Sequence, residues 1–201
     1  MVLLITVLAA YLLGSVSFAV MVSHAYRLPD PREYGSGNPG ATNVLRSGRK
    51  SAAVLTLLGD SAKGWVAVFC AQQWNADGRE LAMALAAVAV IIGHMNPLFH
   101  KFKGGKGVAT ALGVLLGLNW ILAVGTLTTW IIIAVFFRFS SLAALVSALF
   151  AAFFVLILFN ASHPFVWSVT LIAALLIWRH RSNIRNLIGG KERKLGAKSE
   201  T

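Results

Sequence analysis

Long apolar stretches, separated by short polar segments, make up most of the chain as far as residue 179. A helix rises about 1.5 Å per residue, so about 20 apolar residues are enough to cross a bilayer. We therefore predict an all-α integral membrane protein in which residues 1–201 form a single membrane domain. The apolar stretches are residues 2–26, 51–74, 80–100, 108–137, 141–159 and 164–179.

The stretch 108–137 decides how many spans there are, because it is long for one span and short for two. Gly117, Leu118 and Asn119 offer a turn near its middle. With a break there, the chain has seven spans, and 16 of its 18 Lys and Arg residues face one side. Without that break, 8 of the Lys and Arg residues outside the spans lie on the inner side and 9 on the outer side. Positive charge concentrates on the cytoplasmic side, so we expect seven transmembrane helices, with the N-terminus outside and the C-terminus cytoplasmic. The predicted cytoplasmic segments are about 27–50, 100–107, 138–140 and the tail 179–201.

Composition supports a membrane protein and narrows its partners. Hydrophobic residues make up 57% of the chain and charged residues 12%, about half the charged share of soluble domains. The net charge of +11 is spread between apolar stretches, which fits anionic lipid headgroups better than nucleic acid. Residues 1–26 begin apolar without a preceding basic region, so we expect an uncleaved first span.

The first polar segment, residues 35–46, reads GSGNPGATNVLR. Its glycines permit positive φ, and successive N–H groups in such a loop can bind an anion. Arg46 adds a planar donor suited to phosphate. The alternative is a flexible loop whose small residues only make turns, and the match to a dinucleotide-binding fingerprint is weak. The candidate phosphate-binding residues are Ser36, Gly37, Asn38, Gly40, Thr42, Asn43 and Arg46.

The second polar segment, residues 101–110, reads KFKGGKGVAT. A helix is predicted to begin just after it, and a helix N-terminus beside cations is a ready anion site. It is not a Walker A loop, because no Ser or Thr follows Lys106. The alternative, that the lysines only set topology, is our expectation for Lys101. The candidate residues are Lys103, Gly104, Gly105 and Lys106.

The third polar segment, residues 179–192, reads RHRSNIRNLIGGKE. His180 and Asn183 are three residues apart and share one helical face. They could act on a phosphorylated substrate or could simply form the polar face of a basic tail. Glu192 is expected to pair with a neighbouring Arg or Lys.

Two further groups of polar residues are interpreted as structural, and known metal sites are not matched. Asp60 and Lys63, three residues apart inside a span, could pair along one face. His94 is expected to be a hydrogen-bonded packing residue. The chain has no HExxH motif, no Cys/His cluster and few carboxylates, so we expect neither a metal nor another cofactor.

The chain resembles the bacterial membrane glycerol-3-phosphate acyltransferases that use acyl-phosphate, the PlsY family. The resemblance lies in GSGNPGATN with Arg46, in FKGGKGVAT, and in the tail pattern RH..NI..L..G.E. DSAKG at 60–64 and GHMNPLF at 93–99 are also similar to family segments. The likeness runs in order from the first span to Glu192.

The resemblance implies transfer of a fatty acyl group from acyl-phosphate to the 1-position of sn-glycerol 3-phosphate. The products would be lysophosphatidic acid and phosphate, in the first acylation of phospholipid biosynthesis. It also implies a multi-pass protein of the bacterial cytoplasmic (inner) membrane, with its active site at the cytoplasmic face. Functional roles would fall on Ser36, Arg46, Lys106, His180 and Asn183, with Ser141 as a further substrate-binding residue and Glu192 as a structural one.

The sequence leaves two questions open. The proton of the acceptor hydroxyl could go to His180 or to the leaving phosphate, and we expect His180 to act mainly as a hydrogen-bond donor. The alternative function is a membrane transporter of small organic phosphates. A transporter would favour internal repeats and a site at the membrane midplane, whereas these polar segments are predicted to lie on one face.

Overall fold

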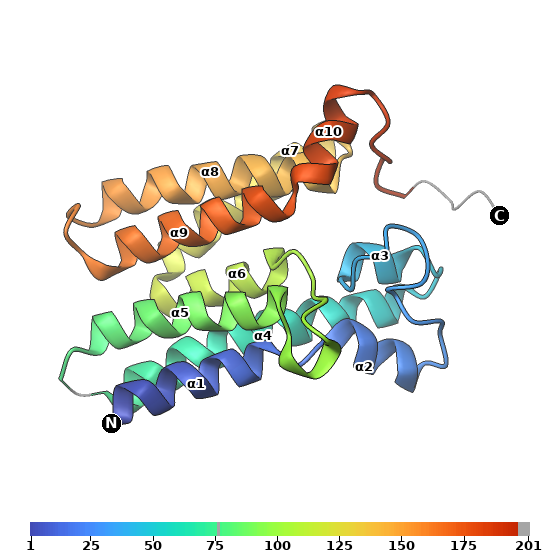
Figure 1. The fold of residues 1–201 in the computed structure, drawn as a ribbon. Helices are drawn as coiled ribbons and strands as arrows, with labels where there is room; N and C mark the ends of the chain where they lie inside the picture. Colours follow the sequence, from blue (N-terminus) through green and yellow to red (C-terminus); the bar gives the residue numbers. More distant parts are fainter. Residues whose placement is uncertain (76, 197–201) are drawn as a thin grey trace.

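The computed structural model describes residues 1–75 and 77–196, and these residues form a bundle of helices (Figure 1). The short helices α2, α3 and α10 lie at the same end of the bundle. The helices are α1 (Val2–Gly14), α2 (Phe18–Ala25), α3 (Ala41–Leu45), α4 (Lys50–Trp74), α5 (Arg79–Met95), the 3-10 helix η1 (Leu98–His100), α6 (Val108–Leu118), α7 (Trp120–Phe137), α8 (Ser140–Leu158), α9 (Pro164–Arg179) and α10 (Arg181–Ile188).

Several helices are long and apolar enough to cross a membrane. Among the described residues four pass this test alone, and the bent pair α1 and α2 makes a fifth. Helices α6 and α9 are apolar but shorter; α6, with 11 residues, is only about 16 Å long. The all-helical, membrane-type fold is confirmed, and the count of seven spans remains a prediction.

The break predicted within 108–137 is present. Helix α6 ends at Leu118, and α7 begins at Trp120. The side chain of Asn119 caps α7, because its Oδ1 accepts a hydrogen bond from the Leu122 N–H at 3.0 Å. A capping side chain satisfies one of the free N–H groups at a helix start, so Asn119 stabilises the new helix where the old one stops.

The stretch 2–26, which we expected to form one span, is also broken. Helices α1 and α2 meet at an angle of 41°. The Lys63 Nζ donates to the Val16 carbonyl at 2.7 Å, and the Ser15 hydroxyl donates to the Tyr11 carbonyl at 3.0 Å. These contacts satisfy carbonyls at the break.

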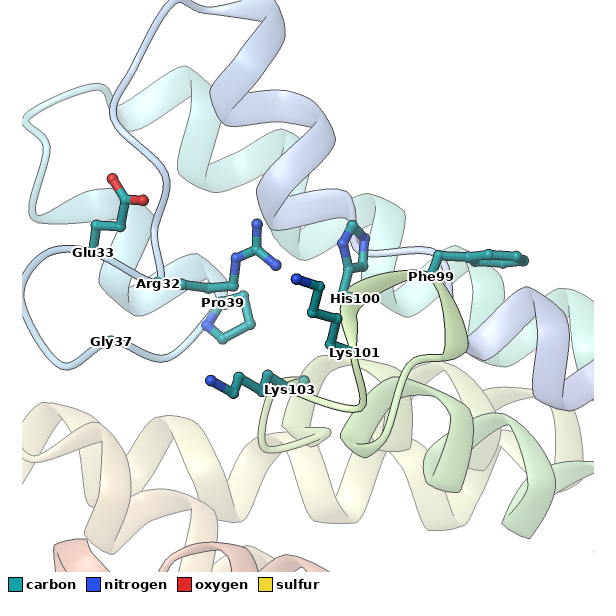
Figure 2. A pocket seen from close by; sticks show the side chains of 9 residues that line it. Arg32, Glu33, Gly37, Pro39, Phe99, His100, Lys101 and Lys103 are labelled. Atoms are coloured by element: carbon teal, nitrogen blue, oxygen red, sulfur yellow. The ribbon is translucent and has the colours of Figure 1, made fainter.

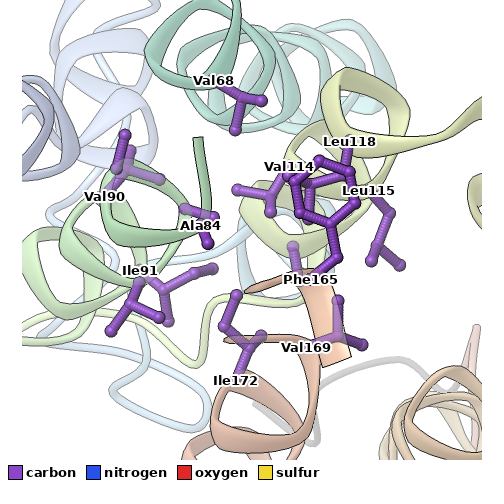
Figure 3. Packing of buried hydrophobic residues seen from close by; sticks show 14 of the residues in the cluster. Val68, Ala84, Val90, Ile91, Val114, Leu115, Leu118, Phe165, Val169 and Ile172 are labelled. Carbon is purple, nitrogen blue, oxygen red and sulfur yellow. The ribbon is translucent and has the colours of Figure 1, made fainter. Parts of the chain in front are cut away.

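The core is built from small and branched apolar residues. Helix α5 is buried along most of its length, and its Val90 and Ile91 belong to one buried cluster with Val114 of α6 and Val169 of α9 (Figure 3). Close helix contact requires small residues. A side chain at Gly64 would collide with the Thr110 carbonyl, so α4 and α6 touch backbone to backbone.

Candidate functional site

A cavity of about 780 Å³, here called the central cavity, opens among the polar segments and extends between the helices. It brings together all five residues for which we expected catalytic roles, although they come from three separate polar segments of the chain. The polar candidates that line it are Ser36, Asn38, Gly40, Thr42, Asn43, Arg46, Lys106, Ser141, His180, Asn183 and Glu192.

The inner wall of the central cavity is apolar. Leu112 and Leu115 of α6 and Trp130 of α7 form part of it, together with Ala148 of α8 and Ile172 of α9. One continuous space therefore has a cationic, hydrogen-bonding end and a long hydrocarbon-like end. Such a space can hold a polar anion and an alkyl chain at the same time.

A chain of hydrogen bonds crosses the polar end. The Lys106 Nζ donates to the Asn183 Oδ1 at 2.7 Å, and the Asn183 Nδ2 donates to the Glu192 Oε1 at 2.7 Å. The Ser141 hydroxyl donates to the same Glu192 oxygen at 2.6 Å. Glu192 thus ties the tail to α8 and α10 through Ser141 and Asn183. The expectation that it pairs with a neighbouring Arg or Lys is wrong within the described residues.

Lys106 is the cation at the centre of this end. Burial lowers the pKa of its ammonium below the ordinary value, Arg46 and Arg179 lower it further, and Glu192 acts in the opposite direction. Desolvation and neighbouring cations both disfavour a charged ammonium. A bound phosphate would offset both effects, so the arrangement favours binding of an anion.

His180 is buried, with 3% of its surface exposed. Its Nδ1 lies 2.7 Å from the Leu176 carbonyl oxygen, which can only accept, so Nδ1 carries the proton. Burial lowers the pKa of His180 to about 4, Lys106 adds to this effect, and the Leu176 hydrogen bond opposes it. The neutral ring therefore presents Nε2 as an acceptor. This geometry argues against the donor role that we expected.

Asn43 holds the first polar segment in shape. Its Oδ1 accepts from the Ser36 N–H at 3.0 Å and from Arg46 at 3.4 Å. Its Nδ2 donates to the Pro31 carbonyl at 2.7 Å and to the Tyr34 carbonyl at 3.1 Å. We expected Asn43 to bind substrate, but these contacts occupy its amide and make it a positioning residue for Ser36 and Arg46.

The glycines of the second segment serve packing. Side chains at Gly104 and Gly105 would collide with the end of α5 at His94. The Gly105 N–H already donates to the His94 carbonyl at 3.1 Å. The Arg179 guanidinium donates to the Gly104 carbonyl at 2.7 Å and to the Gly105 carbonyl at 3.1 Å. The Gly105 N–H is thus not available to a phosphate, whereas the start of α6 lies at the lining of the central cavity and has no side-chain cap; the anion site expected there stays a prediction.

Sequence reasoning missed Arg179. It is one of several basic residues after the last apolar stretch, so its sequence position shows only that a span has ended. Its hydrogen bonds to the carbonyls of Gly104 and Gly105, which precede Lys106, form only when the helices are packed together.

Four expected binding residues, Gly37, Lys103, Gly104 and Gly105, do not line the central cavity. Gly37, Lys103 and Gly104 line a second space of about 550 Å³, here called the basic cleft (Figure 2). Its other lining residues are Arg32, Glu33, Pro39, Phe99, His100 and Lys101.

A buried polar cluster lies beside the central cavity. The predicted pair is present, with the Lys63 Nζ 2.7 Å from the Asp60 Oδ1. His94 is hydrogen-bonded, as we expected, through its Nδ1 to the Thr110 Oγ1 at 3.2 Å. Asp60 and His94 also line the cavity. The cluster connects α4, α5 and α6 beneath the polar end.

Within residues 1–75 and 77–196, no group of three or more His, Cys, Asp or Glu side chains is placed to hold a metal ion. That the reaction needs no metal or other cofactor stays a prediction.

Comparison with known proteins gives consistent similarities over nearly the whole chain. The sequence model of a family described as "Glycerol-3-phosphate acyltransferase" matches residues 4–190. A protein of that name from Burkholderia mallei (strain ATCC 23344) is 56% identical over 199 residues, which cover 98% of each chain.

Two solved structures share the fold. The crystal structure of PlsY (YgiH), an integral membrane glycerol 3-phosphate acyltransferase in its glycerol 3-phosphate form, aligns with a TM-score of 0.89 at 36% identity, covering 96% of each chain. The lysophosphatidic acid form aligns with a TM-score of 0.87, also at 36% identity, covering 96% of this chain and 95% of that one.

Proposed function

The chain belongs to the glycerol-3-phosphate acyltransferase family and is an acyltransferase, and we propose that its acyl donor is acyl-phosphate. It transfers the fatty acyl group to the 1-hydroxyl of sn-glycerol 3-phosphate. The products are lysophosphatidic acid and inorganic phosphate, and the reaction is the first acylation of phospholipid biosynthesis.

The observation that carries this proposal is the two-ended central cavity. Its polar end holds Arg46 and Lys106, which suit two phosphate groups side by side, and its apolar end suits a fatty chain. A water-soluble acceptor and a lipid-like donor can therefore meet in one space. Holding two reactants in contact supplies a large part of the rate enhancement in many enzymes.

The chemistry requires one bond to form and one to break. The 1-hydroxyl oxygen attacks the acyl carbonyl carbon, and the bond from that carbon to the phosphate oxygen breaks. Lys106 and Arg46 stabilise the negative charge that grows on the leaving phosphate. The hydroxyl proton passes to the His180 Nε2 or to the departing phosphate. The hydrogen bond from the His180 Nδ1 to Leu176 orients Nε2 for the first of these routes.

We also propose seven spans, counting the short helices α6 and α9, in the bacterial cytoplasmic (inner) membrane. The N-terminus lies outside, and the active site lies at the cytoplasmic face. This placement is supported by the gathering of α2, α3 and α10 at one end of the bundle (Figure 1). By sequence, the segments of that end carry most of the basic residues.

The test is a donor comparison with purified protein in detergent. Acyl-phosphate, acyl-CoA and acyl carrier protein are supplied separately with glycerol 3-phosphate, and lysophosphatidic acid is measured. Only acyl-phosphate should give product, and EDTA should not reduce the rate. A reaction mixture without the protein is the control for uncatalysed transfer. Product from acyl-CoA but not from acyl-phosphate would overturn the choice of donor.

A further inference from the structure

The basic cleft plays no part in the proposed reaction, yet two of its cations face one another. Figure 2 shows the side-chain nitrogens of Arg32 and Lys101 directed toward one another; Lys103 also lines the cleft, with its nitrogen directed toward the side of Gly37, and the Glu33 carboxylate points away. Asp30 pairs with Arg32, its Oδ1 accepting from the Arg32 Nε at 2.9 Å. Among the described residues no carboxylate lies within ion-pair distance of either lysine. Converging cations favour an anion between them.

The turn that presents the lysines is held in an uncommon conformation. Lys101 and Phe102 have φ values of 53° and 59°, which non-glycine residues rarely adopt. The Phe102 N–H donates to the Pro97 carbonyl at 3.0 Å, and the Lys103 N–H donates to the His100 carbonyl at 3.1 Å. Such strain persists only where the surroundings fix it, and it is concentrated at functional sites.

The wall between the basic cleft and the central cavity is tightly packed. A side chain at Gly105 would lie 2.9 Å from the Pro39 carbonyl, so the two loops that separate the spaces touch. Phe99, which lines the cleft, is 60% exposed, and Phe102, between the two lysines in sequence, is 58% exposed. Exposed Phe rings beside lysines are found in segments that lie at the boundary between lipid and water.

We propose that the basic cleft is a second phosphate-binding site, separate from the central cavity and formed by Lys101, Lys103 and Arg32. At a volume of about 550 Å³ it has room for a phosphate group together with its substituent. The phosphate belongs either to a water-soluble phosphate ester or to the headgroup of an anionic lipid. The proposal does not depend on which acyl donor the enzyme uses.

The test counts phosphate sites by calorimetry on the purified full-length protein in neutral detergent. Inorganic phosphate should bind wild-type protein both in the central cavity and in the cleft; Lys106→Ala should weaken the binding in the central cavity by about tenfold or more and leave the binding in the cleft unchanged. In the Lys106→Ala background, the added changes Lys101→Gln and Lys103→Gln should weaken cleft binding by about tenfold or more. Short-chain phosphatidylglycerol and phosphatidylcholine are titrated into the same proteins to test whether the cleft binds a lipid headgroup.

A charge-matched control separates a site from a general field. Arg185→Gln with Lys191→Gln removes two exposed charges from the tail and should leave binding unchanged in the same background. Binding of inorganic phosphate identifies a soluble ester as the ligand, and binding of phosphatidylglycerol alone identifies a lipid headgroup. The proposal is overturned if neither ligand binds Lys106→Ala protein, or if the control pair weakens binding as much as the cleft pair. Monodisperse elution and an unchanged melting temperature establish that each variant is folded.

Discussion

Lowering the pH should destabilise this protein through His180. Burial lowers the folded-state pKa of His180 to about 4, against an ordinary value of 6.5. The folded state therefore binds this proton less tightly than the unfolded state. The resulting stability is fully present above about pH 6.5 and is lost as the pH falls from there toward 4. The whole effect is roughly 3 kcal/mol, and about 2 kcal/mol of it is lost by pH 5.

The assay compares wild-type and His180→Gln protein in reversible denaturant titrations at pH 7.5 and pH 5.0. Wild-type protein should lose about 2 kcal/mol more unfolding free energy between these pH values than the variant. The contributions of the other titrating groups to the unfolding free energy cancel in this comparison, because both proteins carry those groups. Equal losses would show that His180 titrates normally, and the argument for a neutral ring with Nε2 as acceptor would fail.

Three other predictions concern activity and stability. Lys106→Ala and Arg46→Ala should each lower kcat/KM by about tenfold or more, because a charge-assisted hydrogen bond contributes about 1.5–3 kcal/mol; unchanged kinetics in both would remove the phosphate assignment. Lys63→Met should lower the unfolding free energy by about 3–5 kcal/mol, since it removes the lysine partner of the buried Asp60 and leaves only the His94 Nδ1, 3.6 Å away, beside that carboxylate, and adding Asp60→Asn should recover part of the loss in the same titration. His180→Gln should lower kcat at saturating glycerol 3-phosphate as much as His180→Ala, about 10²–10⁴-fold if Nε2 takes the proton; substantial residual activity in the Gln variant alone would restore the donor role.

Local sequence patterns predicted most of the helices but only one of the two breaks. The break before α7 is encoded by neighbours in sequence, because Asn119 caps the helix that follows it. The break between α1 and α2 depends in part on Lys63, which reaches the Val16 carbonyl from 47 positions away. No local pattern contains that contact, so residues 2–26 read as one apolar stretch.

Which residues line the polar end of the central cavity was predictable from the sequence, but the hydrogen bonds among them were not. Lys106 and Asn183, which bond directly, are 77 positions apart, and Ser141 and Glu192 are 51 positions apart. Because His180 and Asn183 share one helical face, we expected both side chains to bind the same substrate. In the folded chain Asn183 bonds to Lys106 and Glu192, whereas His180 bonds to the Leu176 carbonyl of its own helix.

The glycine-rich loop shows why a motif can mark the right place for a different physical reason. Paired glycines beside lysines suggested backbone N–H groups around a phosphate, but the Gly105 N–H bonds to the His94 carbonyl, and Arg179 binds the loop's carbonyls. The glycines are needed because the loop lies against the end of α5, where a side chain would collide. That close packing sets the position of Lys106. Anion recognition on this side of the central cavity therefore falls to the Lys106 side chain and to the start of α6, which the same packing brings to the cavity wall.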